Sequence, residues 1–365
     1  MIYMTTPNGI KIPFCKPYVD HYESSYAEGI IKQGWLTTGK ITEQFEQEFA
    51  QYVGAKHCVL LSHCTGALFL SYKWIQKKYA QVTNPSHCLN VLVPSLTFAA
   101  TVTEIVHAGL NPVFGDVDRQ TMCLDPKSAP KGWKIQAVAP VHLTGNKAFT
   151  DYNIPVVEDS AHRIERNQCL DNPNLVCFSF YATKNLTMGE GGCICTNDDE
   201  AAAWFKQARH HGISKGGWDR YKENGSWQYD IEFVGWKLNP SDVLAAIGSA
   251  QITKLDEMSK LRYRIVDLYN KELGYNRTGN HLYPVEVSDR TKFINYMKEN
   301  GIQCSVHFLP IHQMTAFKNK SSDYTLPITE YLGGTLVSLP LYPGMKESEV
   351  EYVCEKAKET KLLIY

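Results

Sequence analysis

Short apolar segments that alternate with helical stretches constrain the fold of this chain more than any other feature. They lie at residues 91–93, 112–114, 137–141, 155–157 and 176–178. Strands that are apolar along their whole length are typical of a parallel sheet covered on both faces, because neither side of such a strand faces water. The pattern therefore predicts an α/β fold with a mostly parallel sheet and helices on both sides.

Helix signals come before these strands. The aromatic residues of segment 42–52 fall on one helical face, and Gly54 follows where a C-terminal cap belongs. A strand expected at 57–61 leads into small residues at 62–68, which are typical of a turn that opens a helix.

The last part of the chain mixes its elements differently. Helical patterns fill residues 242–273, and later we expect a strand at 307–309 and a helix at 347–361. This change predicts a large domain at residues 1–250 and a smaller α+β domain at 251–365, with the N-terminal segment as a candidate member of the small domain.

Charge and hydropathy exclude several function classes. The chain has 37 Lys and Arg residues against 38 Asp and Glu residues, so it offers no net field for nucleic acid. We find no apolar stretch long enough to span a bilayer, and the first residues do not form a signal peptide. These features predict a cytoplasmic protein without a membrane or nucleic-acid partner.

The 11 cysteines are odd in number and scattered. Cys58, Cys177, Cys193 and Cys195 lie inside apolar strands, which suits small core residues in a reducing compartment. The spacing of Cys193 and Cys195 does not suit a zinc ligand pair, and no second pair accompanies it. We therefore predict no metal site.

Lys184 is the most informative single residue. It follows an apolar strand, with Ser179 before it and a glycine-rich turn at 189–192 after it. A lysine in this place is either a misplaced charge or a working amine. Burial lowers a lysine pKa from its reference of about 10.4 and makes the amine a nucleophile toward carbonyl groups.

An acidic pair, Glu158 and Asp159, closes an earlier strand, and His162 follows shortly after. An acid at one strand end and a lysine at another are what pyridoxal phosphate (PLP) requires: an amine to bind it and a partner for its pyridinium nitrogen. Asp159 could instead cap the following segment.

The remaining motifs are weak when taken singly. Thr65 and Gly66 belong either to an ordinary strand-to-helix turn or to a phosphate cradle at a helix N-terminus. Ser179 is a core serine or a second phosphate hydroxyl, His162 a core histidine or a neighbour of the cofactor's phenolic oxygen, and Phe98 a core aromatic or a ring that stacks on the cofactor. Their joint order along the chain favours the cofactor interpretation.

At this level of detail the sequence resembles the DegT/StrS family of PLP-dependent sugar aminotransferases, which has the fold of aspartate aminotransferase. The resemblance runs over nearly the whole chain. It is carried by segments 34–39, 94–98, 112–118, 140–145, 158–162, 178–185, 189–192, 245–248, 306–310 and 338–343.

The resemblance implies PLP fold type I, with a seven-stranded mixed sheet and a smaller C-terminal domain. It implies that Lys184 binds the cofactor covalently, Asp159 meets the pyridine nitrogen and His162 lies near the ring oxygen. It also implies that Phe98 stacks on the ring, and that three residues bind the phosphate: Thr65, Gly66 and Ser179.

The implied reaction is a ping-pong transamination within a homodimer that has composite active sites. L-glutamate donates the amino group and leaves as 2-oxoglutarate, and a nucleotide-linked keto sugar accepts it. Family members that dehydrate instead have histidine in place of the lysine, so Lys184 favours transamination.

Two departures from the family bear on the substrate. The segment 235–239 carries Lys237 where the family has asparagine, and a lysine can bind the partner subunit's cofactor phosphate as a point charge. Asn239 is the alternative for this contact. Together with Trp218-Asp219-Arg220, the segment resembles members that aminate UDP-linked 4-keto sugars. The second departure is a short link between residues 162 and 178.

Substrate contacts are less constrained. Thr38, Arg220 and His307 are candidates, the last two for the diphosphate, although Arg220 could be a surface residue and His307 a core residue. Alternatives for the activity are a 3-keto sugar aminotransferase, another PLP reaction on the same fold such as desulfuration or decarboxylation, and a non-catalytic regulator.

Overall fold

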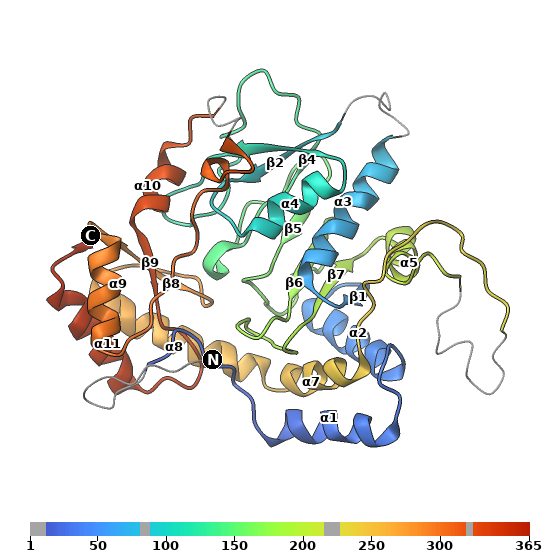
Figure 1. Ribbon diagram of the computed structural model, residues 1–365, viewed down its shortest axis with the longest axis horizontal. Coiled ribbons are helices and arrows are strands. Elements are labelled where there is room, and N and C mark those ends of the chain that lie inside the picture. Colours follow the sequence, from blue (N-terminus) through green and yellow to red (C-terminus); the bar gives the residue numbers. More distant parts are fainter. Residues whose placement is uncertain (1–11, 81–87, 215–226, 319–323) are drawn as a thin grey trace.

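The computed structural model describes residues 12–80, 88–214, 227–318 and 324–365 (Figure 1). A large sheet with helices around it occupies most of the molecule, and a smaller sheet lies beside it with its own helices. Arg220 and its neighbours Trp218 and Asp219 lie outside the described residues.

The large sheet consists of two ladders. One has the order β1-β7-β6-β5, and the other has the order β3-β2-β4. The strands are β1 (His57–Leu61), β2 (Asn90–Pro94), β3 (Asn111–Gly115), β4 (Ala137–Val138), β5 (Val157–Asp159), β6 (Leu175–Ser179) and β7 (Gly192–Thr196).

Parallel bridges from Val138 to Val156 and from Val141 to Asp159 join the two ladders. Only β7 runs antiparallel to its neighbours among these seven strands. The expectation of a mixed, mostly parallel, seven-stranded sheet is therefore confirmed.

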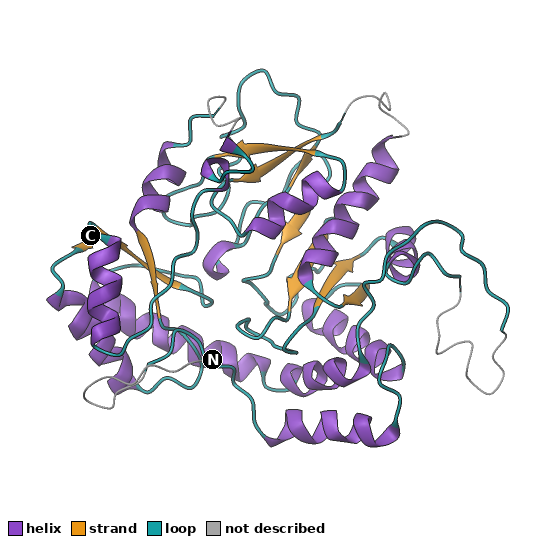
Figure 2. Ribbon diagram, in the orientation of Figure 1, coloured by secondary structure: helices purple, strands orange, loops and turns teal. Residues whose placement is uncertain are grey.

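Helices cover both faces of this sheet (Figure 2). Strand β1 contributes side chains to the cores on both faces of the sheet, because successive side chains of a strand point to opposite faces. Val59 and Leu61 join the core beneath α3 (Cys64–Ala80), α4 (Ala99–His107) and α5 (Asp199–Ala208). Cys58 and Leu60 join the core beneath α2 (Lys40–Val53).

The smaller sheet is antiparallel, with the order β10-β8-β9. Its strands are β8 (Tyr283–Val287), β9 (Leu336–Leu339) and β10 (Leu363–Ile364), and the helices around it are α8 (Leu255–Leu273), α9 (Arg290–Glu299), α10 (Pro327–Thr335) and α11 (Glu347–Glu359). Ile12 bridges Ile302 and packs into this core, so the start of the described chain contacts the C-terminal part.

Helix α1 (His21–Gln33) packs on α7 (Asp242–Ile252). Two short 3-10 helices, η1 (Leu143–Gly145) and η2 (Ile311–Gln313), lie in the connecting segments. Within the described residues, we find no helix that is both long and apolar enough to cross a bilayer.

Most predicted elements exist, with small shifts. The helix at 42–52 and the strand at 57–61 are confirmed, and the strand expected at 137–141 is limited to β4. The strand expected at 307–309 was wrong. His307 and Phe308 both line one cavity, whereas successive side chains of a strand would point to opposite sides.

Candidate active site

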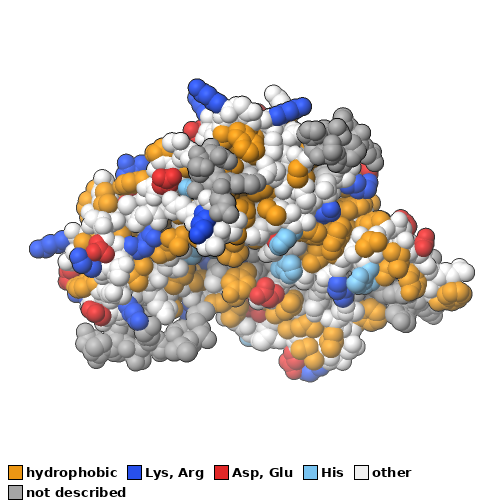
Figure 3. All heavy atoms as spheres, turned by 45° about the horizontal axis from the view of Figure 1, so that its top comes forward, with side chains coloured by type: hydrophobic (Ala, Val, Ile, Leu, Met, Phe, Trp, Pro, Cys, Tyr) orange, Lys and Arg blue, Asp and Glu red, His pale blue; other side chains and the backbone are white. Residues whose placement is uncertain are grey.

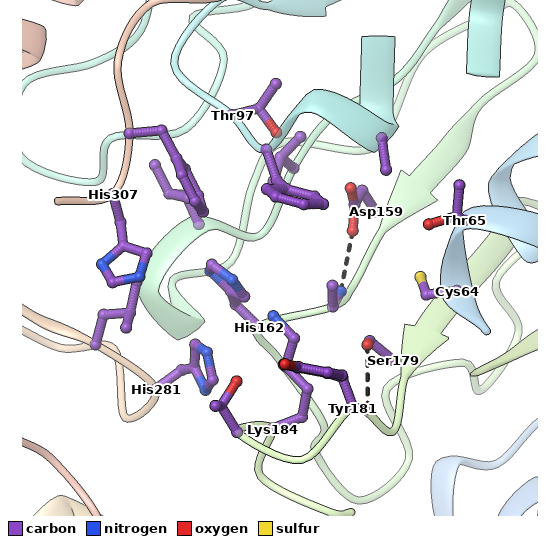
Figure 4. Close-up of a pocket in the computed structure, with 18 of the residues that line it drawn as sticks. Cys64, Thr65, Thr97, Asp159, His162, Ser179, Tyr181, Lys184, His281 and His307 are labelled. Carbon is purple, nitrogen blue, oxygen red and sulfur yellow. Dashed lines mark hydrogen bonds between the residues drawn. The ribbon is translucent and has the colours of Figure 1, made fainter. Parts of the chain in front are cut away.

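A cavity of about 470 Å³ opens where β5 and β6 end and α3 begins (Figure 4). It collects seven of the residues predicted from the sequence: Thr65, Phe98, Asp159, His162, Ser179, Lys184 and His307. Gly66, Thr38, Lys237 and Asn239 do not line this cavity of their own chain. The joint order of weak motifs along the sequence therefore corresponds to one place in space.

Asp159 is the last residue of β5, and it is buried. Its Oδ2 accepts a hydrogen bond from Thr101 Oγ1 at 2.7 Å, and its Oδ1 accepts one from the backbone N–H of Ala161 at 3.1 Å. The Thr101 hydroxyl proton is used in this bond, so Thr97 donates to Thr101 across 2.8 Å. These donors fix the carboxylate in one orientation at the cavity wall.

Glu158, the other residue of the acidic pair, forms hydrogen bonds inside the protein and does not line the cavity. It bonds to His142 Nε2 at 2.8 Å and accepts from Asn172 and Asn174. Burial raises its pKa, but these hydrogen bonds outweigh burial, and the net pKa of Glu158 is lowered. Adjacent residues of a strand point to opposite faces, so only Asp159 can reach the cavity.

Lys184 lies in the loop between β6 and β7, five residues beyond the strand end at Ser179 rather than on the strand. Its backbone N–H donates to the carbonyl of Tyr181 at 2.9 Å, which turns the side chain into the cavity. Burial lowers the pKa of the Lys184 amine, and the Asp159 carboxylate opposes part of this shift. A larger fraction of neutral amine makes Lys184 a better nucleophile and base.

His162 has a ring nitrogen with no partner. Its Nδ1 is buried and makes no hydrogen bond among the described residues. Burial, followed by the charge of Lys184, holds its pKa well below the usual range, so the imidazole is neutral. An unpaired buried polar atom beside a cavity fits a hydrogen bond to a bound molecule.

The opposite end of the cavity suits a phosphate. Thr65 is in the first turn of α3, and Ser179 Oγ accepts a hydrogen bond from the Tyr181 N–H at 3.4 Å. The dipole of α3 favours an anion here. The Gly66 amide, which we expected at the phosphate, donates instead to His63 Nδ1 at 2.8 Å.

Phe98 and His307 also line the cavity. Phe98 is 58% exposed, and its ring centroid lies 5.8 Å from that of Phe308. Burial, together with the charge of Lys184, lowers the pKa of His307 to about 4. His307 is therefore neutral near pH 7 and lacks the positive charge that the sequence analysis expected of it. Its Nδ1 lies 3.0 Å from Ser338 Oγ.

Thr38, Lys237 and Asn239 form a separate cluster near the surface. Asn239 Nδ2 donates to Thr38 Oγ1 at 2.8 Å, and the Lys237 ammonium donates to Asn239 Oδ1. Thr38 Oγ1 donates in turn to the carbonyl of Pro240 at 2.5 Å. The structure thus brings three predicted residues together, but none of them lines the cavity of this chain.

The sequence matches the DegT/DnrJ/EryC1/StrS aminotransferase family over residues 17–358. This chain belongs to that family. It is 34% identical to the spore coat polysaccharide biosynthesis protein SpsC of Bacillus subtilis strain 168, over 95% of this chain and 96% of SpsC. It is 33% identical to an uncharacterised protein of Methanocaldococcus jannaschii, over 95% of this chain and 97% of that protein.

Solved structures agree in fold. Helicobacter pylori PseC, an aminotransferase of pseudoaminic acid biosynthesis, superposes with a TM-score of 0.83 at 19% identity, over 96% of this chain and 99% of PseC. Streptococcus pneumoniae Spr1654, a candidate sugar aminotransferase, gives 0.81 at 25% identity for its apo form, over 96% of this chain and 97% of Spr1654. It has also been solved in PLP and PMP forms.

The protein is therefore a PLP-dependent sugar aminotransferase of fold type I, and its cavity fits that cofactor. A carboxylate held by two donors, an amine of lowered pKa and an unpaired imidazole nitrogen lie on its walls. A helix N-terminus with two nearby hydroxyls completes the set.

Several residues of the site escaped the sequence analysis. Thr97 precedes the N-cap of α4 and Thr101 lies in its first turn, and only the hydrogen bonds from Thr97 to Thr101 and from Thr101 to Asp159 mark them as part of the site. His63 lies within the turn at 62–68, two residues before Thr65, and could have been named with it. His281 carried no comparable signal, because it comes to the cavity from a distant segment of the chain.

Three cysteines come closer together than the sequence suggested. In the described residues, the sulfur atoms of Cys58, Cys193 and Cys195 lie within 4.8 Å of one another. All three are buried in an apolar cluster with Cys169. Neutral thiols suit such a place, whereas metal-bound thiolates would bury several negative charges. The absence of a metal site stays a prediction.

Proposed function

We propose that the protein transfers the amino group of L-glutamate to a nucleotide-linked keto sugar, a 4-keto-6-deoxyhexose or a 4-keto pentose. The reaction has two half-reactions and releases 2-oxoglutarate before the sugar enters. The observation that carries the proposal is Lys184, an amine of lowered pKa in the same cavity as the anchored carboxylate of Asp159.

Bound PLP supplies a ring that accepts the electron pair of the broken C–H bond. Lys184 moves the proton: its neutral amine accepts it from the α-carbon of the amino donor and returns it as an ammonium group. The lowered pKa of Lys184 keeps this amine available near neutral pH. Asp159 holds the pyridine nitrogen protonated, and the hydroxyl groups of Thr65 and Ser179 bind the phosphate.

The names of similar proteins support a sugar substrate. SpsC is named for spore coat polysaccharide biosynthesis, and PseC is named for pseudoaminic acid biosynthesis. The proposal that the sugar is linked to a nucleotide rests on the sequence of segment 235–239 and on Arg220, which resemble members that act on UDP-linked sugars. Within the cavity, His307 fits a hydrogen-bonding role toward the sugar nucleotide, because its imidazole is neutral.

A homodimer with composite sites completes the proposal. Lys237 is exposed and does not line the cavity of its own chain, so its ammonium group can exchange the contact with Asn239 for the phosphate of a partner subunit. Trp227 and Val234, on the projecting segment that precedes Lys237, are 82% and 88% exposed. Figure 3 shows hydrophobic side chains on this right-hand part of the molecule. Large apolar surfaces of this kind favour an interface.

We also place the protein in the cytoplasm, where its free cysteines stay reduced. The test of the function uses purified enzyme, PLP and L-glutamate with UDP-, dTDP- and GDP-linked 4-keto and 3-keto sugars, followed by mass spectrometry. We expect an amino sugar from a 4-keto substrate and none from Lys184→Ala. Amination of 3-keto sugars alone would contradict the proposed C4 position of the keto group. Conversion of L-glutamate to 2-oxoglutarate without any amino-sugar product would contradict the proposal that a nucleotide-linked keto sugar is the acceptor.

A further inference from the structure

His281 is a buried histidine of the cavity wall that the mechanism above does not use. It precedes β8, which belongs to the smaller sheet, and yet its ring lines the same cavity as Lys184. Its ring centroid lies 4.3 Å from that of His162, and the ring planes are inclined by 34°. Figure 4 shows the two imidazoles as neighbours on one side of the cavity.

The orientation of His162 depends on ring contacts. Its Nδ1 makes no hydrogen bond among the described residues and therefore does not fix the ring. The ring lies instead between His281 at 4.3 Å and Phe308 at 6.0 Å between centroids. His281 is the closer of these two neighbours.

His281 is itself firmly anchored. Its Nδ1 lies 2.9 Å from the side-chain oxygen of Asn185, the residue after Lys184. Asn185 Nδ2 donates to Asn280 Oδ1 at 3.2 Å, and Asn280 Nδ2 donates to Ser259 on α8 at 3.0 Å. The backbone N–H of His281 donates to the carbonyl of Thr144 at 2.9 Å. Asn185, itself fixed by Asn280, therefore holds the imidazole, and Thr144 holds the backbone of His281.

The amide chain also sets the tautomer of His281. Since Asn185 uses its Nδ2 as a donor to Asn280, its oxygen faces His281 and accepts from Nδ1–H. Burial is the main reason that the pKa of His281 lies well below the usual range, and the nearby His162, Lys184 and Arg262 oppose a positive charge there as well. The ring is therefore neutral, with its proton on Nδ1, and adds no charge beside His162 or Lys184.

We propose that His281 is a positioning residue, which holds the imidazole of His162 against the cofactor ring and ties it through Asn185 to the Lys184 loop. This inference rests on the proposed place of His162 beside the cofactor's phenolic oxygen. His281 would also link the loop of Lys184 to the smaller sheet, because residue 281 lies between α8 and β8.

The test uses the full-length enzyme loaded with PLP. The measured quantity is the midpoint of the pH titration of the bound cofactor's absorbance, recorded without substrate. In His281→Phe the ring is kept and the anchoring N–H is lost, whereas in Asn185→Ala the anchor is lost and the ring is kept. We expect each variant to move the midpoint by about 0.5–1 pH unit, because the hydrogen bond from His162 to the cofactor is then misdirected.

A double-variant cycle distinguishes positioning from general stability. If His281 acts through His162, then His281→Phe adds little further shift in a His162→Ala background. His312→Phe is the matched control, because His312 is buried but does not line the cavity. In this variant the midpoint of the cofactor titration should stay at the wild-type value. Thermal melting of each variant reports folding separately.

Wild-type midpoints in both His281→Phe and Asn185→Ala would overturn the proposal, as would additive shifts in the cycle. If His281→Phe does not fold, Asn185→Ala with His162→Ala gives the same cycle. An enzyme that binds PLP and aminates no keto sugar would overturn the proposed substrate instead. It would leave this titration readable, since no sugar is used.

Discussion

Asp159→Asn tests the central electrostatic element of the site. The substitution removes the negative charge and keeps the shape of the side chain. The structure indicates that the amide is accommodated: its oxygen can still accept from the Ala161 N–H, and its NH₂ group can donate to Thr101. Thr101 would then donate to Thr97 across the existing 2.8 Å contact. We therefore expect a folded protein with a melting temperature close to that of the wild type.

Activity should respond very differently. The charge-assisted hydrogen bond between a carboxylate and a protonated ring nitrogen contributes about 1.5–3 kcal/mol, which corresponds to roughly ten-fold to more than hundred-fold in affinity. A neutral partner also leaves the ring a poorer electron acceptor, so the loss in rate should exceed the loss in cofactor affinity. We expect the half-reaction with L-glutamate to slow by about two orders of magnitude or more.

The assay follows the bleaching of the bound cofactor's absorbance in a single turnover, beside a dialysis measurement of cofactor retention. Glu158→Gln is the matched control, because this neighbouring carboxylate bonds to His142 and faces away from the cavity. It should lower the melting temperature and leave the half-reaction nearly unchanged. A half-reaction in Asp159→Asn within a few-fold of the wild-type rate would refute the assignment and require another acid at the ring nitrogen.

Three further predictions address other parts of the site. Lys184→Ala should abolish multiple turnover, measured as amino sugar formed per enzyme, and a rate near the parent's would contradict its role. Lys237→Ala should weaken cofactor retention about ten-fold or more. Mixing Lys237→Ala with Lys184→Ala subunits should restore activity, because one site of the mixed dimer carries both substitutions and the other carries neither. No recovery despite verified subunit exchange would contradict the contact of Lys237 with the partner subunit's phosphate. His307 is buried in its neutral form, with a pKa lowered from 6.5 to about 4, so the unfolded chain binds the extra proton. Its contribution to stability is present above pH 6.5 and is lost as the pH falls toward 4, so His307→Gln should flatten the decline of the melting temperature in that window.

The residues at strand ends were predictable because their signals are local. Asp159 closes β5, and Ser179 closes β6, so the carboxyl edge of the sheet could be assigned from short stretches of sequence. Lys184 was recognised from its neighbours, although the strand ends five residues before it. The segment 307–309 was misread because an apolar run near a proline resembles a strand, and only the cavity explains why two successive side chains face the same way.

The supporting contacts could not be predicted, because they join segments far apart in the chain. His281 meets Asn185 across 96 positions, and Thr101 meets Asp159 across 58. No local periodicity encodes such pairs, since the first follows from how the segment before β8 lies against the Lys184 loop and the second from how α4 packs beside β5. The charge state of His307 was unpredictable for the same reason, because its pKa depends on burial and on the nearby Lys184.

The histidines of the cavity give the site a common electrostatic character. His162, His281 and His307 all have lowered pKa values, for which burial is the largest cause in each case and the charge of Lys184 a further one. Neutral imidazoles next to a lysine do not compete with it for protons near pH 7, whereas protonated ones would add repulsion and weaken the ammonium form further. In the proposed mechanism, this arrangement leaves the proton transfer to Lys184, and the neutral histidines act only through hydrogen bonds and ring contacts.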